Sequence, residues 1–253
     1  MITVTKIDIS ELPTKKPRRL YVYLPKDYGK TGRRYPVLYM FDGHCVFYDS
    51  HATYGKSWGM KEYLEKAKTP VILVAVECNP EGFNRLSEYC PWTFTRREVG
   101  TIEGKGKVTM DWFTKTLKPE IDRTFRTLPD REHTLIAGSS MGGLMALYAA
   151  TEYNGVFSRA AALSPSLWVD KKKLSEMIEA HPLADPTIVY MDYGSGEAEG
   201  HRAILEVLFD TAKKLTRQGA HVAARVVPGA MHNEAYWEKR IPVFFEYLFA
   251  GID

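Results

Sequence analysis

The segment Gly-Ser-Ser-Met-Gly at residues 138–142 constrains the fold of this chain more than any other stretch of the sequence. Residues 133–137 form an apolar run that predicts a strand, and residues 144–153 form an apolar run that predicts a helix. A Gly-x-Ser-x-Gly segment in this context predicts a nucleophile elbow, a sharp turn that exposes the central serine at the end of the strand. The alternative interpretation is an ordinary connector rich in glycine and serine.

The glycines indicate which serine is central. An elbow holds its serine in a strained backbone conformation, so the residues two positions away cannot carry large side chains. Ser140 meets this requirement because Gly138 and Gly142 flank it, whereas Ser139 has an alanine and a methionine in those positions. We therefore predict that Ser140 is a catalytic nucleophile and that Met141, which follows it, offers its amide to a developing oxyanion.

The rest of the chain alternates between predicted strands and predicted helices, which indicates an α/β fold with a mostly parallel central sheet and helices on both faces. The continuously apolar runs at residues 36–41 and 71–76 predict strands that are buried on both faces, and further strands are expected at residues 133–137, 160–163, 187–192 and 222–227. Helices are expected at residues 58–67, 108–125, 144–153, 171–180, 203–217 and 235–249, with a kink at Pro119. The alternating segments 2–9 and 20–24 predict an antiparallel N-terminal edge.

Length and composition bound the architecture and the partners. The 253 residues are 45% hydrophobic, which suits a single soluble domain over residues 1–253. The net charge of +3, from 34 basic and 31 acidic residues, predicts no nucleic-acid partner. No secretory signal and no apolar stretch of membrane-spanning length is visible, so no membrane association is expected. The three cysteines lack metal-like spacing and favour a reducing cytoplasm.

A serine hydroxyl needs a base within hydrogen-bond reach, and the base needs a group that fixes its tautomer. In folds with this elbow the chain order is serine, acid, histidine, and the catalytic groups gather at the carboxyl ends of the strands. Of the seven histidines, His201, His221 and His232 follow Ser140 with room for an acid between. Because His201 falls at a helix start and His221 at the start of the last strand, we predict His232 as the base. The alternative is a loop or helix-capping role for His232.

The predicted acid lies at or after the end of the strand at 187–192, where Asp192, Glu197 and Glu199 are candidates. Glu197 is favoured because its Gly-Ser-Gly-Glu turn carries a carboxylate back toward His232. The spacing alone does not choose among the three carboxylates.

The oxyanion hole requires a second amide, from the loop after the strand at 36–41. His44 is the leading donor, through its backbone, and Cys45 is the second. A catalytic thiol at Cys45 would need its own histidine, and none is better placed than the one assigned to the serine. No cluster of histidines, carboxylates or cysteines has metal-ligand spacing, so no metal and no cofactor is predicted.

Two segments, residues 44–57 and 79–106, are expected to form active-site loops. A long aromatic loop in a compact domain is either functional or a packed surface loop. Five aromatic residues are candidates for the wall of a substrate pocket: Tyr48, Tyr54, Trp92, Trp168 and Trp237. For each of them the alternative is ordinary packing in the core or at the rim.

Several motifs of the chain resemble those of the putative esterase family. They are Tyr-Pro-Val-Leu-Tyr-Met-Phe-Asp-Gly at 35–43, Arg85-x-x-Glu88-Tyr89-x-Pro91-Trp92, Leu-Lys-Pro-Glu-Ile-Asp at 117–122, Gly-Ser-Ser-Met-Gly-Gly at 138–143, Leu-Ser-Pro-Ser-Leu-Trp at 163–168 and His-Asn-Glu at 232–234. The resemblance extends from about residue 20 to the C-terminus. The family includes esterase D (S-formylglutathione hydrolase), enterochelin-esterase-like siderophore hydrolases, and feruloyl or acetyl xylan esterase domains.

The resemblance implies an α/β-hydrolase fold and a triad of Ser140, His232 and an acid. The family's acid follows a Gly-x-x-Asp/Glu pattern, which residues 194–197 match. The expected function is hydrolysis of carboxylic esters through an acyl-enzyme. The substrate is expected to be a small molecule: a siderophore, a hydroxycinnamoyl or acetyl sugar ester, or a small thioester. The alternatives are an acyltransferase with the same residues and a non-catalytic binding protein of this fold; the oligomeric state is open, with a homodimer as one candidate.

Overall fold

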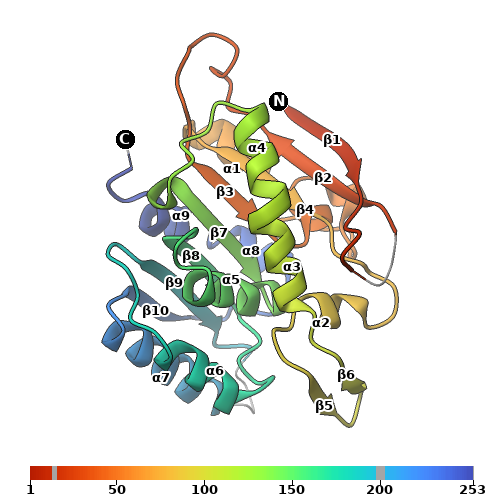
Figure 1. Ribbon diagram of the computed structural model, residues 1–253, viewed down its shortest axis with the longest axis vertical. Helices are drawn as coiled ribbons and strands as arrows, with labels where there is room; N and C mark the ends of the chain where they lie inside the picture. Colours follow the sequence, from red (N-terminus) through yellow and green to blue (C-terminus); the bar gives the residue numbers. More distant parts are fainter. Residues whose placement is uncertain (13–15, 198–202, 253) are drawn as a thin grey trace.

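The computed structural model describes residues 1–12, 16–197 and 203–252. Within these residues the main sheet has eight strands in the spatial order β1-β2-β4-β3-β7-β8-β9-β10 (Figure 1). The strands are β1 (Ile2–Ile7), β2 (Arg18–Tyr23), β3 (Val37–Met40), β4 (Ile72–Val76), β7 (Thr134–Ser139), β8 (Arg159–Leu163), β9 (Ile188–Gly194) and β10 (His221–Val227). A separate hairpin is formed by β5 (Phe94–Arg96) and β6 (Gly100–Ile102).

The sheet is parallel from β4 through β10 in its spatial order, and β1 and β2 form an antiparallel edge. The predicted mostly parallel sheet with an antiparallel N-terminal edge is therefore confirmed. The register pairs Met40 of β3 with Ala137 of β7. Because the two strands end side by side, the loop after β3 begins next to the segment at 138–142.

Helices cover both faces of this sheet, as the sequence predicts (Figure 1). One face carries α3 (Gly106–Trp112), the π-helical η3 (Phe113–Leu117), α4 (Lys118–Thr124), α5 (Met141–Glu152), α6 (Lys171–Glu179) and α7 (Ala203–Arg217). The other carries α1 (Met60–Ala67), α8 (Glu234–Glu238) and α9 (Ile241–Phe249). The connections contain α2 (Asn84–Glu88), η1 (Gly43–Cys45), η2 (Asp49–His51) and η4 (Arg131–His133). None of the described helices has the length and apolar character needed to cross a membrane.

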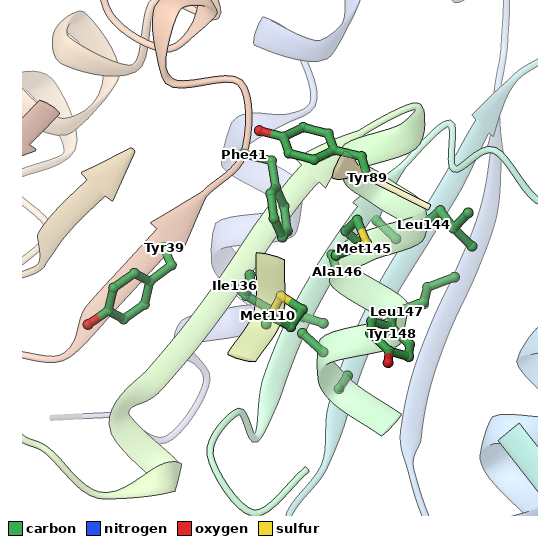
Figure 2. Close-up of a cluster of buried hydrophobic side chains, with 14 of the residues drawn as sticks. Tyr39, Phe41, Tyr89, Met110, Ile136, Leu144, Met145, Ala146, Leu147 and Tyr148 are labelled. Atoms are coloured by element: carbon green, nitrogen blue, oxygen red, sulfur yellow. The ribbon is translucent and has the colours of Figure 1, made fainter. Parts of the chain in front are cut away.

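The sheet separates two hydrophobic cores, which explains why its central strands are apolar at every position. Tyr39 of β3 faces the core beneath α3 to α7, whereas Leu38 and Met40 face the core beneath α1, α8 and α9. Figure 2 shows the first of these cores, in which labelled side chains of the sheet such as Ile136 lie beside those of α5 such as Met145. Residues 141–151 of α5 are all buried, so this helix is anchored along its length.

Three predicted elements differ from the structure. The helix predicted at 108–125 consists of α3, η3 and α4, because Pro119 has no amide hydrogen to donate to the carbonyl one turn earlier. The helix predicted at 235–249 divides into α8 and α9, because Pro242 in the first turn of α9 has the same effect. The segment at 79–106, predicted as a loop, contains α2 and the β5–β6 hairpin.

Candidate active site

The predicted nucleophile, Ser140, sits in a sharp turn between β7 and α5. Its backbone angles, φ 57° and ψ −121°, place it at positive φ, where a residue other than glycine is strained. Two backbone hydrogen bonds hold the turn. The Ser140 amide donates to the Leu163 carbonyl at 3.0 Å, and the Ser166 amide donates to the Ser140 carbonyl at 2.9 Å. Ser140 therefore lies at the carboxyl end of β7 and at the start of α5.

Close contacts leave little room for a side chain on either of the two glycines of the segment. A Cβ atom on Gly138 would lie 2.6 Å from the backbone of Gly142, and a Cβ atom on Gly142 would lie 3.0 Å from Cβ of Phe41. This is the steric pattern expected of an elbow centred on Ser140. Ser139, in contrast, is the last residue of β7 and is buried.

His232 lies on the loop after β10, and Glu197 lies on the turn after β9. A hydrogen bond of 2.7 Å joins Nδ1 of His232 to Oε2 of Glu197. When a carboxylate engages Nδ1, Nε2 remains as the ring nitrogen that can exchange a proton with a neighbouring hydroxyl. The His232 side chain is about half exposed, and its ring packs edge-on against Trp237 with the ring centres 5.1 Å apart.

Four groups bind the carboxylate of Glu197, whose side chain is 4% exposed. In addition to the bond from His232, Oε1 accepts hydrogen bonds from Ser164 Oγ at 2.7 Å, the Gly194 amide at 2.9 Å and Arg240 Nη2 at 3.1 Å. Burial alone would raise the pKa of Glu197. The hydrogen bonds from His232 and Ser164 outweigh burial and hold that pKa below its usual value. The carboxylate is therefore ionised and held in one orientation.

Asp192, the competing acid candidate on β9, has a different set of partners. It is fully buried, and its carboxylate accepts hydrogen bonds from Arg240 Nη1 at 2.8 Å and from the Tyr190 hydroxyl at 2.6 Å. Burial raises the pKa of Asp192. Glu197 accepts the hydrogen bond from His232, whereas Asp192 makes no hydrogen bond to His232 and shares only Arg240 with Glu197.

The remaining candidates for base and acid are not part of this pair. Glu199 and His201 lie outside the described residues. His221 is the first residue of β10, and its Nε2 lies 3.5 Å from Oδ1 of Asp185. Because the strands are parallel, His221 is at the sheet edge opposite to the one at which Ser140 lies, as the sequence predicts.

The predicted oxyanion-hole donors are the amides of Met141 and His44. Met141 is the first residue of α5, and His44 is the middle residue of η1, which follows β3. Neither amide donates a hydrogen bond to another described residue. The amide of Cys45, the second donor considered from the sequence, bonds the Asp42 carbonyl at 2.7 Å. Of the two donors considered in this loop, the one whose amide remains open is therefore His44.

Arg85 of α2 holds the loop that carries His44. Its guanidinium binds both carboxylate oxygens of Asp42, at 2.7 Å from Nε and 2.8 Å from Nη2. The Asp42 amide donates to the Tyr89 hydroxyl at 3.1 Å. Burial would raise the pKa of Asp42, but the charge and hydrogen bonds of Arg85 hold it below its usual value. The motifs at 35–43 and 85–92 thus form one assembly beside the elbow.

A cavity of about 460 Å³ joins these groups. Ser140, His232 and His44 lie on its wall. Two of the five predicted pocket aromatics also line this cavity. Tyr54 is 83% exposed at its opening, and Trp237 is buried.

The other three aromatic candidates lie elsewhere. Trp168 lines a neighbouring cavity of about 850 Å³, whose wall also includes His232. Tyr48 packs edge-on against His51, with the ring centres 5.2 Å apart, and Trp92 packs against the core beneath α3 to α7. Within the described residues, neither Tyr48 nor Trp92 lines either cavity, which corresponds to the alternative of ordinary packing.

Residues 12–247 match the sequence family that is described as Putative esterase. The chain belongs to the putative esterase family. The match covers the strand before the elbow, the elbow itself and the loops that carry Glu197 and His232.

This esterase is similar to several known proteins. The uncharacterized protein YbbA of Bacillus subtilis (strain 168) is 24% identical over 242 residues, which are 92% of each chain. Esterase Rv1288 of Mycobacterium tuberculosis (strain ATCC 25618 / H37Rv) is 32% identical over 148 residues, which are 56% of this chain and 28% of that protein. The crystal structure of an IroE-like serine hydrolase from Shewanella oneidensis has a TM-score of 0.79 at 21% identity, over 100% of this chain and 82% of that one. The predicted α/β-hydrolase fold and the predicted enzyme class, a serine ester hydrolase, are confirmed.

Two polar residues that support the site of this esterase were not assigned from the sequence. Arg240 binds both Asp192 and Glu197. Ser164 donates to Glu197, and its Oγ accepts hydrogen bonds from Trp237 Nε1 at 3.1 Å and Arg240 Nη1 at 3.0 Å. Ser164 also has a positive φ of 45°. It lies in the family motif at 163–168, which is a signal for it, whereas Arg240 has no local sequence signal.

The structure of the esterase brings together one group of potential metal ligands that the sequence spacing does not predict. Atoms of Asp42, His44 and Cys78 lie within 4.8 Å of one another. They are poorly suited to bind a metal ion, because Arg85 occupies both oxygens of Asp42. Burial and the charge of Asp42 also raise the pKa of the Cys78 thiol well above its usual value, so the thiolate ligand is disfavoured.

Proposed function

We propose that this esterase hydrolyses carboxylic esters through an acyl-enzyme formed on Ser140, with His232 as the base and Glu197 as the orienting acid. The observation that carries the proposal is the 2.7 Å hydrogen bond between His232 and Glu197, next to a cavity that Ser140 also lines. A serine, an ionised carboxylate and a histidine, in this chain order, are the groups that nucleophilic acyl transfer requires.

In the first half of the reaction, Ser140 Oγ attacks the ester carbonyl and His232 Nε2 accepts the hydroxyl proton. The amides of Met141 and His44 bind the negative charge that develops on the carbonyl oxygen. In the structure a hydrogen bond of 3.4 Å joins Ser140 Oγ to Ser166 Oγ. The hydrogen bond from Ser140 to His232 is expected to form when substrate enters, since catalytic hydrogen bonds often tighten in the complex.

In the second half, His232 gives the proton to the leaving alcohol, and a water molecule repeats the attack on the acyl-enzyme. The Glu197 carboxylate stabilises the imidazolium that forms in each step. The substrate is a small-molecule ester, and siderophore esters, hydroxycinnamoyl or acetyl sugar esters and small thioesters are the classes to compare. An acyltransferase would use the same residues with an alcohol in place of water, so product analysis with added alcohol separates the two reactions.

The nucleophile assignment is tested with Ser140→Ala, and Ser139→Ala serves as the matched control. Loss of a triad nucleophile lowers turnover by roughly a million-fold, so Ser140→Ala is expected to be almost inactive on a short p-nitrophenyl ester. Ser139→Ala is expected to retain substantial turnover. A fluorophosphonate probe should label Ser140, as read by peptide mass spectrometry. A covalent adduct on another residue would contradict the mechanism.

A further inference from the structure

Glu234 is a buried acidic residue that the proposed mechanism does not use. It is the first residue of α8, two positions after His232, and it is 8% exposed. It lies on the wall of the same 460 Å³ cavity as Ser140. The residue is therefore mostly buried, and it lines the cavity that the proposed nucleophile and base also line.

The side-chain carboxylate of Glu234 makes no hydrogen bond or ion pair with any described residue. Arg85, the arginine on the same cavity wall, forms an ion pair with Asp42. Arg240 forms ion pairs with Asp192 and Glu197. A mostly buried carboxylate without a protein partner depends on the solvent of the cavity for its hydration, and a donor group of a bound molecule can replace that solvent. Glu238, on the same helix, shows the ordinary arrangement, with an exposed ion pair of 2.8 Å to Lys56.

A second buried polar group of the cavity wall is also without a partner. His44 is 6% exposed, and its Nε2 lies 3.0 Å from the Thr53 hydroxyl. Its other ring nitrogen, Nδ1, has no hydrogen-bond partner among the described residues. The Nδ1 atom of His44 is closed off from solvent, whereas the carboxylate of Glu234 is not, so Glu234 is the one of the two groups that a molecule in the cavity can reach.

We infer that Glu234 is a specificity-determining residue that accepts a hydrogen bond from a donor group of the substrate, an ammonium or a hydroxyl. This inference rests on the proposed ester hydrolysis. It restricts the expected substrates of the enzyme to esters that carry such a donor group. With Arg85 and Asp42 paired to each other, the carboxylate of Glu234 adds unpaired negative charge to the cavity. Anionic esters are therefore disfavoured.

The test compares esters of matched shape. Hydrolysis of 2-(dimethylamino)ethyl butyrate is compared with that of 3-methylbutyl butyrate, and 2-hydroxyethyl butyrate with propyl butyrate. A third pair, methyl 3-(dimethylamino)propanoate and methyl 4-methylpentanoate, places the ammonium on the acyl side. The wild-type protein is expected to have a kcat/KM at least about tenfold higher for the donor ester in one or more pairs, since a hydrogen bond to a charged group supplies that much discrimination.

Glu234→Gln removes the charge and keeps the size of the side chain, so the ammonium preference is expected to fall to within about twofold of unity. The hydroxyl preference is expected to fall less, because the amide oxygen can still accept a hydrogen bond. Glu238→Gln, on the same helix, is the matched control and should keep the wild-type ratios. Equal kcat/KM values within every pair for the wild-type protein would overturn the inference, as would ratios that Glu234→Gln leaves unchanged.

A binding measurement separates this inference from the proposed function. Ligand-observed NMR with the wild-type protein should detect butylammonium but not butan-1-ol at equal concentration, and the signal should be lost in Glu234→Gln. Binding of butylammonium without hydrolysis of any ester would contradict the proposed function and support the role of Glu234. Hydrolysis of esters without ammonium or hydroxyl preference would support the function and contradict the role of Glu234.

Discussion

At the scale of single residues, Arg240 joins Asp192 and Glu197, but the two carboxylates differ in their other partners. Glu197 binds His232, whereas Asp192 binds Tyr190 inside the protein. The same arginine therefore connects a carboxylate proposed to act in catalysis with one that has a structural role. Substitution of each carboxylate should consequently change a different property of the enzyme.

Glu197→Gln is expected to lower kcat by roughly ten-thousand-fold, because the amide no longer holds His232 in the required tautomer. Asp192→Asn is expected to act on stability instead. It weakens a buried ion pair with Arg240, and loss of one partner of such a pair costs about 3 to 5 kcal/mol. Urea denaturation and steady-state kinetics on the folded fraction distinguish the two effects. An inactive but folded Asp192→Asn, together with an active Glu197→Gln, would identify Asp192 as the acid.

At the scale of elements, the strand–turn–helix unit depends on contacts that leave no room for a side chain. Gly138→Ala should force the Cβ atom against the backbone of Gly142, where the distance would be 2.6 Å. Overpacking of this kind costs about 1 to 3 kcal/mol. We expect a lower urea midpoint and a large loss of turnover, because Ser140 moves with the turn.

Gly155→Ala is the matched control for the elbow variant, since a Cβ at Gly155 meets nothing within 4 Å and its φ is not in the left-handed region. It should leave both the urea midpoint and the turnover close to the wild-type values. If Gly138→Ala behaved like Gly155→Ala, the steric account of the elbow would be wrong.

The elements also show what could be predicted from the sequence. The elbow and the buried strands follow from local pattern and glycine spacing, so they could be located without coordinates. The choice of Glu197 over Asp192 as the partner of His232 could not, because it depends on the direction of a side chain in a turn after β9. Pro242 is a local sequence signal for the break between α8 and α9. No local signal predicts the hydrogen bond between Arg240 and Asp192, which are 48 residues apart in the chain.

At the scale of the whole molecule, the lowered pKa of Glu197 links folding to pH. A carboxyl group with a lower pKa in the folded than in the unfolded chain adds stability above its unfolded pKa, near 4.3, and loses it as pH falls through the folded value. The difference in Tm between wild type and Glu197→Gln should therefore be larger at pH 6 than at pH 3. A difference that grows toward pH 3 would show that Glu197 is not held as the anion.

The residues of the proposed site are synthesised one after another, because the ribosome makes the chain from its N-terminus. The elbow at Ser140 and the sheet through β9 are translated first, whereas His232 and Arg240 lie 92 and 100 residues after Ser140. Domains fold as units during and after synthesis, and here the proposed nucleophile is made well before the proposed base and before the cation that binds Glu197. A nascent chain that stops before His232 therefore carries the proposed nucleophile without the proposed base. Under the proposed mechanism, esterase activity is expected only after the segment that contains α8 and α9 has left the ribosome.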